Sequence, residues 1–374
     1  MKRQQEGIKG DELMKGKYLI LILVVLLSAC AASVRTEVPK GTVTVFYEKE
    51  TLNPEKGTLA VVAASRKEAA EKGTADEGLE TLLTPQKYAR VGRFFFSYAL
   101  GPENMVVLSL PNPADEKKKE SGPFRGSDVW IFRSSGNIRL TKTVFFHIDP
   151  SFSSGGDFIY FASRRGAATE RTDEQKYHIW RIPSLSSGGL TRIGFPAFSY
   201  QGPVESPDGK KLLYSGREVY ENVPALWYAE VNGALPTRLT GGVDGGWIDN
   251  ETILFAAPDD DTGRYALWTC RIDGSLLTQI AADAEKDCFQ PCVDPSGRYI
   301  AFTKQVPGKP ETADIYVLGL RDYLTRQLTT NLSRDDMPRW SRDGKFIYFR
   351  SSRGLGWNIW RIPAAFLERE SPAS

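Results

Sequence analysis

An internal repeat constrains the fold of this chain more than any other feature of its sequence. Six dipeptides, each an apolar residue followed by an aromatic one, recur with successive spacings of 50, 47, 41, 48 and 44 residues. A period of roughly 40 to 50 residues is typical of propeller blades. The repeat therefore predicts six blades in one ring, with the aromatic residues in the blade cores. The dipeptides are Val129-Trp130, Ile179-Trp180, Leu226-Trp227, Leu267-Trp268, Ile315-Tyr316 and Ile359-Trp360.

Short apolar runs and turn motifs occur in phase with these dipeptides. The runs end near Leu108, Phe161, Tyr214, Phe255, Phe302 and Phe349. They are rich in β-branched and aromatic residues, and apolar and polar residues show little strict alternation along them, as expected for strands buried on both faces. Tight turns precede three of them, and several units close on a leucine-threonine strand, which gives about four strands per unit. The turns are Ser206-Pro-Asp-Gly209, Asp294-Pro-Ser-Gly297 and Ser341-Arg-Asp-Gly344, and the closing strands include Arg139-Leu-Thr141, Arg238-Leu-Thr240 and Gln327-Leu-Thr329.

The last unit carries the clearest family signature. Asp336-Met-Pro-Arg-Trp-Ser-Arg-Asp-Gly-Lys-Phe-Ile-Tyr-Phe-Arg-Ser-Ser-Arg-Gly354, followed by Asn358-Ile-Trp-Arg361, resembles the WD-like repeat of the TolB propeller family. The resemblance covers residues 90–366 and implies an all-β fold, a six-bladed β-propeller of four-stranded antiparallel blades. We expect no counterpart of that family's larger N-terminal α/β domain, because only about sixty residues separate Cys30 from the first unit.

The last unit lacks its own leucine-threonine strand, so an earlier segment must cover its open edge. Residues 42–89 are expected to supply a ring-closing strand, with Glu80-Thr-Leu-Leu-Thr84 the best candidate beside Thr42–Phe46 and Leu59–Val62. A short helix is predicted from Ser65 to Lys72. Residues 367–374 are expected to form a tail.

The N-terminus reads as a secretion signal. An apolar run from Tyr18 to Ala29 follows Lys15 and Lys17 and is too short for an untilted membrane span. It ends in Leu27-Ser-Ala-Cys30, which resembles the bacterial lipobox, in which the cysteine thiol receives diacylglycerol. A plain cleaved signal or a single membrane anchor are the alternatives.

The predicted processing divides the start of the chain. Residues 1–29 are expected to be a lipoprotein signal peptide, and 30–41 a linker anchored to the membrane through Cys30. Met14 is the better start, so residues 1–13 read as an artefact of the assigned start. Removing residues 1–29 lowers the formal charge from +2 to 0. Binding of nucleic acid requires an excess of basic residues to neutralise phosphates, so with this balanced charge we expect no nucleic-acid partner.

Three further cysteines would share an oxidising compartment. Among Cys270, Cys288 and Cys292 we expect one disulfide and one buried thiol, with Cys288 to Cys292 and Cys270 to Cys288 both open. A metal site at Cys288-Phe-Gln-Pro-Cys292 is disfavoured, because no second pair or nearby histidine completes it.

Residues for catalysis are scarce. The sequence contains no G-x-S-x-G elbow, and its only histidines are His147 and His178, which we expect to be packed or at a rim. Asp259-Asp-Asp-Thr-Gly263 has the spacing of a weak calcium loop but lacks the bidentate glutamate, so an acidic hairpin is the better interpretation. We expect no catalytic residues, no metal and no cofactor.

Arginines in repeated Ser-Arg-Gly elements are the remaining recognition candidates. Arg164, Arg165 and Arg353 could line a channel or rim and bind carboxylates, or could simply end hairpins. The sequence thus predicts a non-enzymatic envelope lipoprotein with a protein partner. Resemblance to TolB implies the periplasmic face of the outer membrane, because Ala31 follows Cys30. The alternatives are a carbohydrate-active or metal-assisted lyase, with a histidine and carboxylates converging at the channel, and a sensor of a sugar or small ligand.

Overall fold

The structure, a computed structural model, describes three short N-terminal strands and most of residues 97–367. Within 97–367 it leaves out residues 114–123, 134, 167–175, 194–198, 218–223, 233–234, 331, 354–356 and 366. The predicted signal peptide, Cys30, the linker, the Ser65–Lys72 helix and residues 368–374 of the predicted tail lie outside the described residues, whereas Leu367 is buried in a hydrophobic core. Among the described residues, no helix is long and apolar enough to cross a membrane.

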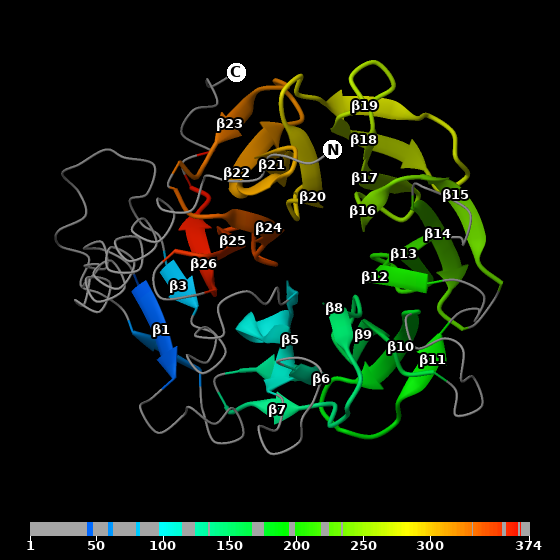
Figure 1. Ribbon diagram of the computed structural model, residues 1–374, viewed down its shortest axis with the longest axis vertical. Helices are drawn as coiled ribbons and strands as arrows, with labels where there is room; N and C mark the ends of the chain where they lie inside the picture. The colour runs from blue at the N-terminus through cyan, green and yellow to red at the C-terminus, as the bar shows by residue number, and fades with distance from the viewer. Residues whose placement is uncertain are drawn as a thin grey trace, which may run out of the picture. The chain divides into compact units, whose positions relative to one another are not determined.

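Six sheets surround a common centre as the blades of a propeller (Figure 1), and the four strands of each blade are antiparallel, which confirms the predicted fold class. In each blade the first strand lies nearest the centre, and in blades 1 to 5 the fourth lies outermost. Blade 1 contains β4 (Tyr98–Leu100), β5 (Val106–Pro113), β6 (Phe124–Phe132) and β7 (Ile138–Arg139); blade 2 contains β8 (His147–Phe152), β9 (Phe158–Ser163), β10 (His178–Pro183) and β11 (Thr191–Ile193); blade 3 contains β12 (Ser199–Glu205), β13 (Lys211–Arg217), β14 (Ala225–Glu230) and β15 (Thr237–Gly241).

The other three blades follow the same order. Blade 4 contains β16 (Val243–Trp247), β17 (Thr252–Pro258), β18 (Tyr265–Arg271) and β19 (Thr278–Ala281); blade 5 contains β20 (Asp287–Val293), β21 (Tyr299–Val306), β22 (Lys309–Gly319) and β23 (Thr325–Gln327); blade 6 contains β24 (Asp335–Trp340), β25 (Phe346–Ser351) and β26 (Asn358–Pro363).

The fourth strand of blade 6 comes from the N-terminal segment, as predicted. Strand β3 (Glu80–Leu82) pairs antiparallel with β26, with Thr81 opposite Trp360. Strands β1 (Val43–Tyr47) and β2 (Leu59–Val62) extend the same sheet beyond β3, and β1 runs parallel to β3. The ring is therefore closed by a strand that lies far from the last blade in sequence.

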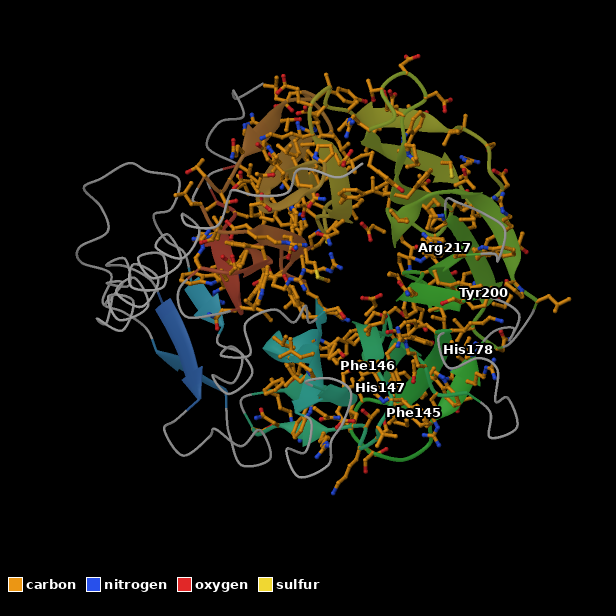
Figure 2. All side chains as sticks on the ribbon, viewed as in Figure 1. Phe145, Phe146, His147, His178, Tyr200 and Arg217 are labelled. Carbon is orange, nitrogen blue, oxygen red and sulfur yellow. The ribbon has the colours of Figure 1, made fainter. Side chains whose placement is uncertain are left out.

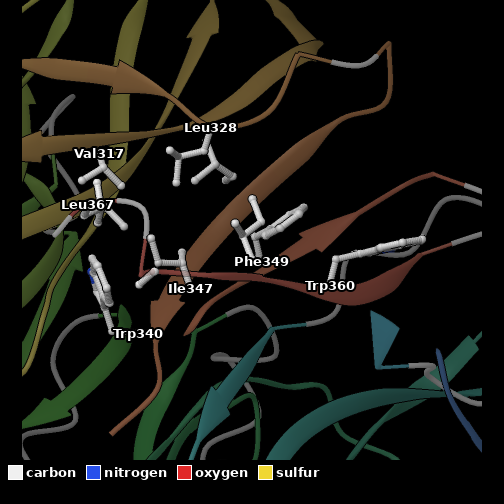
Figure 3. Close-up of a cluster of buried hydrophobic side chains, with 11 residues drawn as sticks. Val317, Leu328, Trp340, Ile347, Phe349, Trp360 and Leu367 are labelled. Atoms are coloured by element: carbon white, nitrogen blue, oxygen red, sulfur yellow. The ribbon is translucent and has the colours of Figure 1, made fainter. Parts of the chain in front are cut away.

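Hydrophobic cores lie between neighbouring blades. Tyr160 of blade 2 packs in one cluster with Tyr200, Leu212 and Trp227 of blade 3, and Figure 2 labels Tyr200 in this region. The cluster drawn in Figure 3 joins blade 5 to blade 6 and includes Phe349, which is completely buried. Central strands pack on both faces in this arrangement, which explains why their sequences alternate so little.

The repeated threonines have a structural task. Thr329 Oγ1 accepts a hydrogen bond from Ile315 N at 3.0 Å and donates one to Asp314 Oδ1 at 3.1 Å. Blade 1 repeats the arrangement, with Thr141 between Val129 N and Asp128. The hydroxyl thus joins the outer strand to the strand before it, which accounts for the leucine-threonine motif.

Candidate functional site

A kink occurs in the first strand of five consecutive blades. At each kink the pairing register shifts and one residue has a positive φ between 50° and 62°. Positive φ is costly for residues other than glycine, and such strain often marks functional regions. The five residues are Asp149, Gly202, Asp244, Gln290 and Met337.

Several of these kinks are bonded to one another across blades. Gln290 N donates to Asp244 Oδ2 at 3.0 Å, and Met337 N donates to Gln290 Oε1 at 2.9 Å. Asp149 N donates to Ser97 Oγ of blade 1 at 2.6 Å. These bonds link adjacent blades near the centre of the ring and hold the kinked side chains in place.

A cavity of about 420 Å³ is lined by two of these kink residues, Asp244 and Gln290, and we call it the central pocket. Four blades contribute to its wall, so it forms only when the ring assembles. Its lining combines charged, amide and aromatic side chains. The residues are Arg217, Pro224, Val243, Asp244, Tyr265, Phe289, Gln290, Thr303, Gln305, Arg334 and Asp336.

One side of the central pocket is a rigid cluster of charges. Asp336 is almost completely buried, and Arg350 binds both of its carboxylate oxygens, at 2.7 and 2.8 Å. Arg334 adds a third bond, from Nε to Asp336 Oδ2 at 2.7 Å. Trp357 lies beneath the guanidinium group of Arg350, with 4.9 Å between Cζ and the ring centroid. Because both carboxylate oxygens of Asp336 already accept bonds from arginines, Asp336 has few acceptor sites left for a ligand.

Other residues that line the central pocket have hydrogen-bonding groups or apolar surface without a partner in the described part of the chain. The rings of Tyr265 and Phe289 are in contact, with centroids 4.7 Å apart. Although the side chain of Asp244 is exposed to the pocket, desolvation by the protein around it raises its pKa to about 6. Asp149 across the ring adds to this increase, while the bond from Gln290 N and the charge of Arg339 oppose it. Asp244 therefore changes charge near neutral pH.

His147 is packed away from the central pocket. Its side chain is fully buried, Nε2 lies 2.8 Å from Thr143 Oγ1, and the ring contacts Phe161 edge-on. Nδ1 has no hydrogen-bond partner among the described residues. Burial lowers the pKa of His147 to about 4, although Asp128 opposes the change. The neutral ring is thus a core residue, as expected.

Stability should consequently fall in mild acid. The unfolded chain binds a proton at His147 near pH 6.5 and the folded chain only near pH 4, so the free energy of unfolding decreases as the pH drops between them. For this group the decrease between pH 7 and pH 5 is about 2 kcal/mol. Denaturant titrations at both pH values should show that His147→Gln has a smaller pH dependence than the wild type. Equal pH dependence in both proteins would contradict this role.

His178 is also part of a blade. It occupies the position held by Asp128 in blade 1 and Asp314 in blade 5, next to the aromatic dipeptide. Arg192 Nη2 lies 3.0 Å from its Nδ1, as Arg139 binds Asp128. Figure 2 places His147 and His178 in blade 2, apart from Arg217. Neither histidine lines the central pocket.

The three arginines singled out from the sequence lie among aromatic side chains. Arg164 lies over Tyr177, and Arg165 lies over Trp180, with Cζ 4.9 and 5.6 Å from the ring centroids. Arg353 lies over Trp360 and binds Asp335 Oδ2 at 2.6 Å. None of the three lines the central pocket, and recognition of a carboxylate by these arginines stays a prediction.

The expected disulfide is not present, because Cys270, Cys288 and Cys292 are all free thiols. Cys288 and Cys292 lie on one strand, but Cys288 packs in the core between blades 4 and 5, whereas Cys292 packs against the core between blades 5 and 6. Cys270 and Cys288 belong to different interblade cores. Burial raises the pKa of Cys288 to about 12, so this thiol is protonated and unreactive.

The acidic loop Asp259–Gly263 is a hairpin connection. Asp259 Oδ1 accepts bonds from the backbone and hydroxyl of Thr262, and Oδ2 accepts one from Gln279. In the described part of the chain no three His, Cys, Asp or Glu side chains are grouped as a metal site would require.

Sequence reasoning missed the residues of the central pocket. Arg217, Asp244, Tyr265 and Phe289 do not belong to the aromatic dipeptides, the turn motifs or the closing strands from which the repeat was identified. The one available signal was the sequence Val243-Asp-Gly-Gly-Trp247, in which an aspartate and glycines interrupt a first strand.

Comparison with known proteins supports the fold assignment. No family model matches the chain. A solved structure from Agrobacterium tumefaciens that is assigned to TolB covers 60% of this chain and 77% of its own length, with a TM-score of 0.50 and 18% identity. The chain folds as a TolB-like β-propeller.

The TolB-like propeller also resembles proteins with other activities. A puromycin-hydrolyzing peptidase from Mycobacterium tuberculosis is 14% identical, with a TM-score of 0.52, and covers 74% of this chain and 44% of its own length. Hydrazine synthase from Kuenenia stuttgartiensis is 15% identical, also with a TM-score of 0.52, and covers 70% and 44%. At such low identity these likenesses show the fold alone.

A relative in sequence has no assigned activity. An uncharacterized protein of Agrobacterium fabrum is 28% identical over 208 residues, which is 49% of this chain. The match spans 65% of that relative's length. The function of the TolB-like propeller must therefore be argued from its own residues.

Proposed function

We propose that this protein is a non-enzymatic lipoprotein of the bacterial cell envelope that uses its propeller to bind a partner protein. The observation that carries the proposal is the central pocket. It presents Arg217, Asp244 and the Tyr265–Phe289 pair at the centre of the ring, with no histidine in its lining. Aromatic and arginine side chains are enriched where proteins recognise one another.

Packing of the two histidines favours binding over catalysis. A lyase of the kind considered above would bring His147 or His178 together with carboxylates at the centre of the ring, whereas both rings are buried inside blade 2. The carboxylate of Asp336 is occupied by arginines. The other lining groups, Arg217, Asp244 and the Tyr265–Phe289 pair, suit the binding of a partner.

Anchoring is the second part of the proposal. The lipobox-like Leu27-Ser-Ala-Cys30 would place diacylglycerol on Cys30, and more than one acyl chain holds a protein stably on a bilayer. Ala31 after the cysteine favours the periplasmic face of the outer membrane. The propeller would then present its central pocket to envelope proteins.

A pull-down from envelope extract tests both parts. The wild type should recover the same envelope proteins repeatedly, and Arg217→Glu should lose them. Lys210→Glu, an exposed change in the turn between β12 and β13 and outside the pocket lining, should retain them. Cys30→Ser should move the protein from the membrane fraction to the soluble fraction. Recovery that is equal for both charge reversals would refute the pocket as the binding surface, and an unchanged membrane fraction would refute lipidation.

A further inference from the structure

Two opposite charges in the central pocket are left without an ion-pair partner. Arg217 is exposed at the end of β13, and its guanidinium group forms no hydrogen bond or ion pair with the described residues. Asp244 uses Oδ2 to accept the bond from Gln290 N, and its other oxygen accepts none from the described part of the chain. Arg217 and Asp244 form no salt bridge with each other, although both line the same 420 Å³ pocket.

An aromatic surface lies in the same pocket as these two charges. Both Asp244 and Arg217 act electrostatically on Tyr265: burial raises the pKa of Tyr265, Asp244 raises it further, and Arg217 lowers it. Phe289 contacts the Tyr265 ring and widens the apolar surface. The pocket thus offers a cation, an anion and an apolar face to one small molecule.

We propose that the central pocket binds a small zwitterion of the short-peptide class, with its carboxylate on Arg217 and its ammonium group on Asp244. An anion alone would meet the carboxylate of Asp244, and a cation alone would meet Arg217. A zwitterion satisfies both charges, and its apolar part can pack on Tyr265 and Phe289. The volume lies in the range of small-molecule sites.

Amide groups in the wall suit a peptide in particular. Gln290 uses its Oε1 to accept bonds from Met337 N and Thr303 Oγ1, which orients its amide nitrogen as the group left to donate. Gln305 also lines the pocket. Such groups can bind the peptide link between the two charged ends. The inference rests on the recognition role proposed for this pocket and specifies its ligand.

Binding should depend on pH through Asp244. The charged and polar groups that face this carboxylate are Arg339 on β24, Asp149 on β8, Gln290 on β20, Tyr265 on β18 and Arg217 on β13. Because the pKa of Asp244 is about 6, its carboxylate is ionised at pH 7.5 and mostly protonated at pH 5. Affinity for an ammonium group should therefore fall about tenfold between these pH values.

Calorimetry of the full chain with three peptides tests the inference. The probes are Ala-Ala, N-acetyl-Ala-Ala and Ala-Ala amide at pH 7.5, so that each derivative lacks one terminal charge. Ala-Ala should bind, and each derivative should bind at least tenfold more weakly. The Asp244→Asn variant should bind Ala-Ala and N-acetyl-Ala-Ala with equal affinity. The Arg217→Gln variant should bind Ala-Ala and Ala-Ala amide with equal affinity.

Matched controls separate local from general effects of charge. Glu251→Gln and Lys210→Gln remove one charge of each sign at exposed positions outside the pocket, and both should bind Ala-Ala as the wild type does. Undetectable binding of Ala-Ala at millimolar concentration, or equal binding of all three peptides, would overturn the inference. Either result would leave the pull-down free to succeed, because that experiment measures a macromolecular partner.

Discussion

Replacing Asp336 by asparagine is expected to lower the free energy of unfolding by about 3–5 kcal/mol. The side chain is almost completely buried and receives charged bonds from Arg350 and Arg334. In the variant the buried guanidinium group of Arg350 faces a neutral amide in place of a carboxylate. Breaking a buried ion pair at one partner is costly for this reason, whereas its net contribution to stability can be small.

Denaturant unfolding of three variants checks this prediction. Asp336→Asn should unfold at a much lower denaturant concentration than the wild type. The double variant Asp336→Leu with Arg350→Met removes both charges. Its free energy of unfolding should therefore fall less than that of the single variant. Glu251→Gln, at an exposed carboxylate, should stay within about 0.5 kcal/mol of the wild type. A wild-type midpoint for Asp336→Asn would show that the cluster does not stabilise the fold.

Changing Leu82 to proline is expected to open the ring. Leu82 lies in β3 opposite Ile359 of β26, whose backbone N–H and C=O face β3 because those of Trp360 face β25. Proline cannot donate a backbone hydrogen bond, and it is excluded from the interior of a sheet. Loss of this bond would leave a backbone acceptor on β26 unpaired, so we expect a loss of about 1–3 kcal/mol in the free energy of unfolding.

Leu82→Val is the matched control, because it keeps the backbone N–H and the β propensity. Thermal unfolding should give a clearly lower midpoint for the proline variant than for the valine variant. Hydrogen exchange should be faster in the proline variant at Ile359 and Arg361, whose amides face β3, than at Trp360, whose amide faces β25. If these amides remain protected in both variants, another segment must cover the edge of blade 6.

The sequence was sufficient to predict the propeller and how it closes. Each blade repeats the same local solution, an apolar strand, a tight turn and an aromatic dipeptide, so six imperfect copies reinforce one another. The turn Ser206-Pro-Asp-Gly209 illustrates this: Ser206 Oγ bonds Asp208, and Gly209 takes a positive φ of 72°. Short-range chemistry of this kind does not depend on what the blades pack against.

The structure changed the interpretation of isolated residues. Cys288 and Cys292 suggested a disulfide by their proximity in sequence, yet they pack in different interblade cores and are free thiols. Arg353 is paired with Asp335 inside blade 6, and its role in recognition stays a prediction. Spacing along a chain does not reveal direction or partners in space.

The sequence by itself determined the number of blades, their order and the need for a strand to close the last one, because those features follow from repetition and from unpaired strand edges. Only the tertiary structure decided which charges are already neutralised and which remain available. Asp336 is surrounded by arginines, whereas Asp244 and Arg217 share a pocket without pairing. That distinction arises where four blades meet, because it depends on which side chains of neighbouring blades lie close together in space, and the repeat does not reveal this.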